Sequence, residues 1–204
     1  MKVLVTGFGP FPGVTINVSE TVLPALKSHA MSTSWMQIDT VVLPASYYRA
    51  SLQIGRLLAT GTWNMALLLG QGSASSAIEL ASAASNSISA QIPDTDGTRL
   101  GGELLGIGPA EVETGFNVER LAALGKENGI NVVVTAGCGT YVCNSTFYTA
   151  LLLSPTTCPV VFAHLPSLQA AKQPDGDNSS NQLVRDLTRL LELACDVLCN
   201  RAHG

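Results

Sequence analysis

Short apolar runs alternate with segments of helical spacing along most of this chain, and that alternation restricts the folds open to it. Each run has the length and character of a buried strand; the runs are Lys2–Thr6, Ile38–Leu43, Met65–Leu69, Val132–Thr135 and Pro159–Ala163. Strands that alternate with helices pair in parallel through right-handed crossovers, which place helices on both faces of the sheet. The pattern therefore predicts an α/β fold with a mostly parallel sheet.

The segments between and after these runs carry apolar residues at helical spacing. The expected helices are Asn17–Ser28, Tyr47–Ala59, Val112–Glu127, Cys143–Leu153 and Asn181–Asn200. The Ser- and Ala-rich segment 73–90 follows neither period, so the sequence leaves open whether it forms a strand. The Gly-rich segment Leu100–Gly108 is expected to be a loop that covers a site or contacts a neighbouring subunit.

Length and charge limit the organisation and the partners. A chain of 204 residues without a break in composition is expected to form one domain, residues 1–204. The net charge is -4 and no Lys/Arg cluster occurs, which argues against a nucleic-acid partner or an anionic membrane surface. Only 13% of the residues are charged, against about 25% in an ordinary domain. We expect the additional apolar surface to be buried between the subunits of a homo-oligomer.

The sequence also indicates a compartment. It shows no charged region followed by an apolar one at its start, and no apolar run of about 18 residues. The five cysteines are an odd number, which favours free thiols over a disulfide framework. These observations predict a cytoplasmic protein without a membrane segment.

No motif indicates a cofactor or a metal. The glycines of the Gly7–Gly13 loop follow a strand, but Pro10 and Pro12 remove backbone donors that a phosphate would need. Cys195 and Cys199 share a helix face, and core packing explains them better than a metal site because no histidine or carboxylate cluster accompanies them. We therefore expect no bound cofactor.

The stretch 132–148 predicts a strand, a Gly-rich turn and a helix, with Cys143 near the helix start. Unpaired backbone N–H groups and the helix dipole lower the pKa of a thiol at such a position. Of the three histidines, His29, His164 and His203, only His164 has a comparable setting, at the end of an apolar strand. A lone Cys or His is more often a core residue, but the two placements together meet the requirement for a Cys–His nucleophile pair.

Several motifs follow one another in a distinctive order. They are Val5–Gly13 with Asn17 and Ser19, Gly70-Gln71, Asn86, Ile92–Asp94 with Gly97, Ala136–Asn144 with Tyr148, and His164–Pro166. In this order the chain resembles the pyroglutamyl peptidases, also called pyrrolidone-carboxylate peptidases. The resemblance implies a three-layer α/β/α sandwich and a cysteine peptidase that removes an N-terminal pyroglutamyl residue from peptides.

The resemblance also implies roles for individual residues. Cys143 would be the nucleophile, and His164 would take its proton and later protonate the leaving amine. A small neutral lactam is held best between apolar walls with a few polar groups. The residues implied for this pocket are Phe8 and Phe11 beside the ring, Gln71 at its polar edge, and Tyr141 and Val142 in the lining.

The chain departs from the family at charged positions of the site. Ala81 stands where the family has a glutamate that orients the histidine, and Ser75 and Ser82 stand at arginine positions. Glu79 could replace the glutamate only if its segment is a strand, where residues 79 and 81 share a face. Asp94 is a second candidate, although bonding within its own turn is the simpler explanation.

The sequence leaves three functions open. The first is a pyroglutamyl peptidase with Cys143 and His164, and with Glu79 or no residue as the third group. Gln91 stands where the family commonly has an arginine, and a neutral amide stabilises a transition state less than a charged donor. The second is a relative that uses the same pair on another amide, lactam or thioester. The third is a non-catalytic relative that binds a small ligand.

Overall fold

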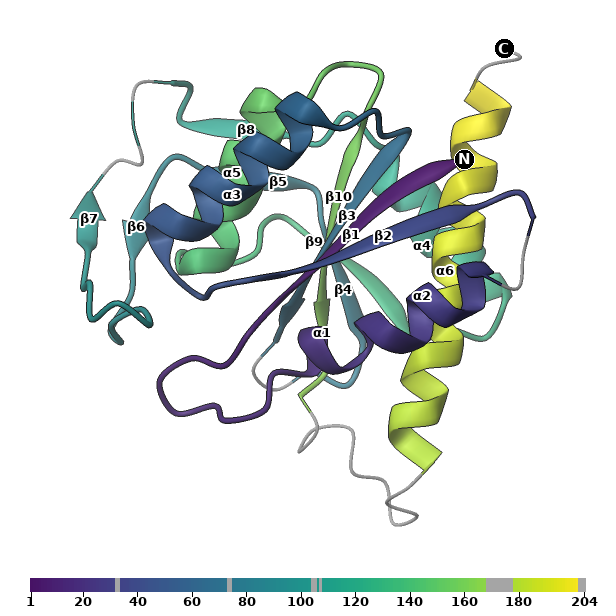
Figure 1. The fold of residues 1–204 in the computed structure, drawn as a ribbon, viewed down its shortest axis with the longest axis horizontal. Coiled ribbons are helices and arrows are strands. Elements are labelled where there is room, and N and C mark those ends of the chain that lie inside the picture. Colours follow the sequence, from purple (N-terminus) through teal and green to yellow (C-terminus); the bar gives the residue numbers. More distant parts are fainter. Residues whose placement is uncertain (32–33, 73–74, 104–105, 107, 168–177, 202–204) are drawn as a thin grey trace.

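The computed structural model describes residues 1–31, 34–72, 75–103, 106, 108–167 and 178–201. Its centre is a six-stranded sheet in the order β2-β1-β3-β10-β4-β9 (Figure 1). These strands are β1 (Lys2–Phe8), β2 (Gln37–Leu43), β3 (Met65–Gln71), β4 (Ile78–Ala81), β9 (Val132–Thr135) and β10 (Val160–Leu165). Neighbouring strands are parallel except for β10 and β4, which are antiparallel. The predicted mostly parallel sheet is confirmed.

Helices cover both faces of this sheet, as Figure 1 shows. One face carries α1 (Val18–Thr21), α2 (Leu23–Met31), α4 (Val118–Glu127) and α6 (Asn178–Arg201). The other carries α3 (Tyr47–Thr60) and α5 (Val142–Leu153). Strand β1 serves both cores because its side chains alternate: Val3 and Val5 pack in the first, and Leu4 packs in the second. The result is the three-layer α/β/α sandwich that the resemblance implied.

Two small sheets lie outside the central one. Strand β5 (Ala83–Ser85) pairs with β8 (Glu111–Glu113), and β6 (Ile88–Ser89) pairs with β7 (Gly101–Glu103). Figure 1 places β6 and β7 at the left edge of the molecule. The segment that the sequence left open therefore contributes three strands, β4, β5 and β6. Part of the expected loop at 100–108 is strand β7, and residues 104, 105 and 107 lie outside the described residues.

The helix predicted over Val112–Glu127 begins later than expected. Its first residues belong to β8, because pairing with β5 satisfies their backbone groups. Helix α4 starts directly after Asn117, whose side chain accepts a hydrogen bond from the backbone N–H of Arg120. Its end is as predicted, with Asn128 as C-cap and Gly129 at φ +76°.

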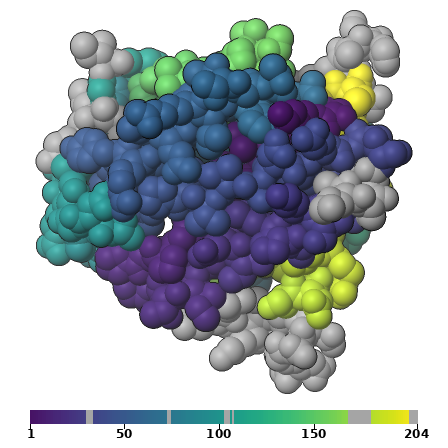
Figure 2. Space-filling view, in the orientation of Figure 1, coloured from purple at the N-terminus to yellow at the C-terminus, as the bar shows by residue number. Residues whose placement is uncertain are grey.

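The N-terminal part of the chain covers much of one side of the molecule. The helix predicted over Asn17–Ser28 is divided into α1 and α2, with Val22 between them. In the space-filling view, the purple and blue segments from β1 to α3 make up most of the visible face (Figure 2).

None of the helices in the described parts of the chain has the length and apolar composition that a membrane crossing requires.

Candidate active site

Cys143 is the second residue of α5, the helix that follows β9. The chain reverses between them through Gly139, whose φ of +81° suits a residue without a side chain. Tyr141 is the N-cap, and its carbonyl accepts from the backbone N–H of Asn144. Cys143 therefore lies in the first turn of a helix, as the sequence predicted.

His164 is the penultimate residue of β10. The alternation of that strand turns Ala163 and Leu165 toward the α1, α2, α4 and α6 layer, so Phe162 and His164 face the α3 and α5 layer. The rings of Phe162 and His164 pack edge to face, with 4.9 Å between their centroids. This contact holds the imidazole on the face of the sheet where α5 begins.

Gly70 makes room for the thiol and the imidazole to approach one another. It is the partner of His164 in the β3–β10 register. A Cβ at Gly70 would lie 2.9 Å from Cys143 Sγ, from His164 Cδ2 and from Phe162 Cζ. The sulfur and the ring carbon consequently lie within twice that distance of each other, and no larger residue fits between them.

Glu79 lies on the other side of His164. Glu79 lies within strand β4, as its proposed role requires. It is the antiparallel partner of His164, so the two side chains share a face of the sheet. A Cβ at Gly72 would be 3.5 Å from His164 Cβ and 3.9 Å from Glu79 Oε2. No ion pair between described residues joins them. Burial lowers the pKa of His164, and the charge of Glu79 opposes that lowering. The condition under which Glu79 could replace the family glutamate is met.

The protonation of the pair differs from the sequence expectation. Burial raises the pKa of the Cys143 thiol to about 12, although a backbone N–H at the helix start opposes it. The predicted lowering of this pKa is wrong because the loss of water around the sulfur outweighs the helix start. Burial also lowers the pKa of His164, more than Glu79 raises it. Both shifts favour the uncharged forms, a neutral thiol beside a neutral imidazole.

A cleft of about 620 Å³ opens beside these groups. Six of the residues singled out from the sequence line it together: Phe11, Gln71, Glu79, Tyr141, Cys143 and His164. Phe8 and Val142 do not line it, because their side chains are only 2% and 1% exposed in the core under α3 and α5. Strand β1 continues through Phe8, which turns this ring into the same layer as Leu4. Phe8 and Val142 therefore face the core in this structure, and their contacts with a substrate stay a prediction.

The polar groups of the cleft are fixed by neighbouring elements. Gln71 Oε1 accepts from the backbone N–H of Val18 at 2.9 Å, which leaves the amide NH₂ to donate. Tyr141 donates its hydroxyl to the Pro93 carbonyl at 2.9 Å, and its ring lies 6.1 Å from that of Phe11. Burial, the charge of Asp94 and that of Cys143 raise the pKa of Tyr141 to about 12, so its hydroxyl keeps its proton.

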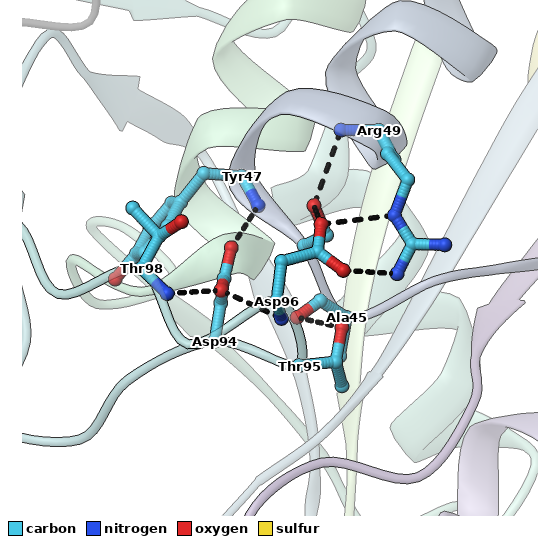
Figure 3. A network of polar contacts seen from close by, with 8 residues as sticks. Ala45, Tyr47, Arg49, Asp94, Thr95, Asp96 and Thr98 are labelled. Carbon is cyan, nitrogen blue, oxygen red and sulfur yellow. Dashed lines mark hydrogen bonds and ion pairs between the residues drawn. The ribbon is translucent and has the colours of Figure 1, made fainter.

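Asp94 is engaged elsewhere, as Figure 3 shows. Its carboxylate accepts from the backbone N–H groups of Tyr47, Asp96 and Thr98 at 3.0, 2.9 and 2.8 Å. The side chain is 1% exposed and does not line the cleft. The simpler explanation, bonding around its own turn, therefore accounts for Asp94, and Glu79 remains as the carboxylate beside His164.

The residues that stand where the family has a charged side chain differ in their surroundings. Ala81 is buried opposite Phe162 in the β4–β10 register. Ser75 accepts from the backbone N–H of Ala77, and Gln91 is exposed and does not line the cleft. Among the described residues that line the cleft, Glu79 consequently supplies the carboxylate.

Comparisons with known proteins agree on one family. The sequence model of the pyroglutamyl peptidase family matches residues 1–194 of this chain. The chain belongs to the pyroglutamyl peptidase family. A pyrrolidone-carboxylate peptidase of Streptococcus pneumoniae is 27% identical over 97% of this chain and 92% of its own length.

Solved structures of family members have the same fold. The pyroglutamyl peptidase I of Bacillus amyloliquefaciens is 26% identical, with a TM-score of 0.78 over 95% of this chain and 94% of that one. The pyrrolidone carboxyl peptidase of Thermus thermophilus is also 26% identical, with a TM-score of 0.80 over 95% and 98%. The sequence resemblance to the family is thus confirmed.

Sequence reasoning missed several residues of this family member's site. Those that line the cleft and lie outside the recognised motifs are Val14, Gly72, Ser89, Ala90 and Ser167. Most lie next to a recognised motif, which was the available signal. Asn144 was quoted only as part of a motif, yet its side chain bonds the backbone of Ser85 and Ser87 and holds that segment against α5. Nothing in the local sequence indicates those partners.

The described residues contain no group of three or more His, Cys, Asp or Glu side chains that could hold a metal. Cys195 is buried, as expected, whereas Cys199 is exposed, contrary to the core packing expected of it. A second cavity, of about 780 Å³, lies near Met1, Pro155 and Cys199, away from the thiol and imidazole. The candidate site is therefore the cleft that contains Cys143 and His164.

Proposed function

We propose that the protein hydrolyses the amide bond after an N-terminal pyroglutamyl residue, with Cys143 as nucleophile and His164 as general base. The observation that carries this proposal is the convergence of Cys143 Sγ and His164 on the space above Gly70, in a cleft with apolar walls. Family membership supports the same activity, because the relatives compared above are named as pyroglutamyl or pyrrolidone-carboxylate peptidases.

Acylation begins from the neutral pair. Because burial keeps the proton on Cys143, His164 accepts that proton as the sulfur attacks the scissile carbonyl carbon. A C–S bond forms and the carbonyl electrons move to oxygen, near the backbone N–H groups at the start of α5. His164 then donates the proton to the leaving nitrogen, the C–N bond breaks, and a pyroglutamyl thioester remains on Cys143.

Deacylation uses the same groups with water. His164 takes a proton from a water molecule as its oxygen attacks the thioester carbonyl. The C–S bond breaks, the proton returns to Cys143, and free pyroglutamic acid leaves. Atoms balance with one water consumed for each amide bond broken.

We assign the lactam ring to the wall formed by Phe11 and Tyr141. These rings supply apolar surface, and the free NH₂ of Gln71 is available to donate to the lactam carbonyl. Glu79 acts as a positioning residue, because its charge favours the imidazolium that forms transiently on His164.

The assay uses the reduced protein with pyroglutamyl-coumarin amide, and with glutaminyl-coumarin amide as the matched open-chain substrate. We expect fluorophore release from the first, little from the second, and none from Cys143→Ser. Release of both at equal rates would contradict the assignment of a lactam pocket. No release from a folded protein would overturn the function.

We also propose a cytoplasmic homodimer or homotetramer. Free cysteines suit a reducing compartment, and Cys138, Cys143, Cys158, Cys195 and Cys199 are all free. Exposed apolar side chains on α3 and α5, Tyr48, Leu52, Leu152 and Leu153, provide surface that a second copy could bury. Light scattering after size-exclusion chromatography measures the mass directly, and a monomer at all concentrations would contradict this assembly.

A further inference from the structure

We infer that Asp94, which lies outside the cleft, is a positioning residue that holds the Tyr141 wall of the cleft in its place. The inference rests on the proposed function for the identity of the ligand, but the link between Asp94 and Tyr141 is a property of the fold. It gives a role to a buried carboxylate that the proposed chemistry does not use.

Asp94 joins two segments that lie far apart in the sequence. One carboxylate oxygen, Oδ1, accepts from the backbone N–H groups of Asp96 and Thr98 and shapes the turn. The other, Oδ2, accepts from the N–H of Tyr47, the first residue of α3. Figure 3 shows the carboxylate between the turn and the helix start. A negative charge at a helix N-terminus is favourable, so this charge-assisted hydrogen bond is stronger than one between neutral groups.

Tyr141 depends on both of these segments. Its hydroxyl donates to the carbonyl of Pro93, the residue before Asp94, at 2.9 Å. Its ring also meets the ring of Tyr47 edge-on, with 5.5 Å between centroids and 81° between planes. Asp94 thus fixes the acceptor and the packing partner of the same side chain.

The position of Tyr141 affects both parts of the site. Its ring lines the cleft, and its backbone carbonyl accepts from the N–H groups of Asn144 and Ser145 at 3.0 and 3.3 Å. As N-cap of α5 it also stands two residues before Cys143. Releasing the Asp94 turn should therefore loosen the lactam wall first and the helix start second.

A matched control lies in the same network. Arg49 donates to Asp96 through its Nε at 2.9 Å on the exposed side of the turn. Asp96 also accepts from Ser46 Oγ at 2.6 Å. An exposed ion pair of this kind contributes little, and Arg49→Gln leaves all three bonds of Asp94 intact.

The test compares Asp94→Asn with Arg49→Gln. An asparagine has one acceptor oxygen, so it loses either the bond to α3 or the two bonds in the turn, while its volume is unchanged. We expect Asp94→Asn to raise KM for pyroglutamyl-coumarin amide about fivefold with kcat within about twofold. Tyr141→Phe should do the same, and the double variant should be no worse than the worse single, because both changes break one linkage.

A second readout needs no substrate. Hydrogen exchange at the amides of Asn144 and Ser145 should rise in Asp94→Asn and stay unchanged in Arg49→Gln, at a temperature where both are folded. Unchanged exchange at those amides, or additive KM effects in the double variant, would overturn the inference. If the wild type cleaves no pyroglutamyl amide while the exchange result holds, the proposed function fails and the role of Asp94 in the fold stands.

Discussion

Two carboxylates that the sequence offered for the same task, Glu79 and Asp94, differ in what surrounds them. Glu79 projects from β4 beside His164 and has the cleft on one side. Asp94 is buried in a turn where three backbone N–H groups take its lone pairs. A carboxylate whose oxygens are already occupied stabilises structure, whereas one that faces a titratable ring is able to influence chemistry.

The largest expected effect concerns the ring that Glu79 faces. His164→Ala should lower kcat/KM about 1,000-fold, because it removes the imidazole that takes the proton of the thiol. His29→Ala is the matched control, since His29 pairs with Glu192 at 3.1 Å and does not line the cleft. Steady-state kinetics of the two variants checks this, and equal losses would show that the effect is not specific to the site.

A second prediction concerns the protonation state of Cys143. Because its pKa is raised to about 12, the thiolate fraction should grow in proportion to hydroxide across neutral pH. Alkylation by iodoacetamide, followed at Cys143 by peptide mass spectrometry, should accelerate about 100-fold from about pH 6 to about pH 8. A fast rate that is flat down to about pH 5 would mean a preformed thiolate–imidazolium pair.

Removing Asp94 altogether should reveal its structural role. Asp94→Ala leaves three backbone N–H groups without their acceptor, and we expect a loss of about 2 kcal/mol in the free energy of unfolding. Glu79→Ala should change that free energy by less than about 0.5 kcal/mol, since its carboxylate faces the cleft. Urea denaturation measures both, and a larger loss for Glu79→Ala would reverse the comparison.

Removing the charge of Glu79 should reveal its influence on the chemistry. Glu79→Gln should lower kcat about tenfold. Since Glu79 raises the pKa of His164, its removal lowers that pKa further, and the acidic limb of the pH–rate profile should move to lower pH. An unchanged kcat and an unmoved limb would exclude Glu79 from the mechanism.

The elements that the sequence predicted well are those with local signals. The Val-rich run of β9 and the apolar spacing of α5 define strand and helix without reference to the rest of the chain. Strand β4 carries no such signal, because its identity depends on pairing with β10 and β9. Strand β8 was missed for the same reason, since its pairing with β5 decides it.

The site residues also divide into those with a local sequence signal and those that depend on distant parts of the chain. Cys143 and His164 could be found from their positions at a helix start and a strand end, and family motifs supported them. That Glu79 lies opposite His164 follows from the register of two strands about eighty residues apart, which no local pattern encodes. The raised pKa of Cys143 depends on how completely the fold removes water from the sulfur, so the helix start alone gave the wrong direction.

In the proposed mechanism, Cys143 carries the acyl group during turnover. The most direct measurement is acid quenching during the reaction with an activated pyroglutamyl ester, followed by peptide mass spectrometry. We expect one pyroglutamyl group on the peptide that contains Cys143, absent from Cys143→Ser and accumulated in a variant with slow deacylation. Turnover with no adduct, or with the adduct on Cys138, would contradict it.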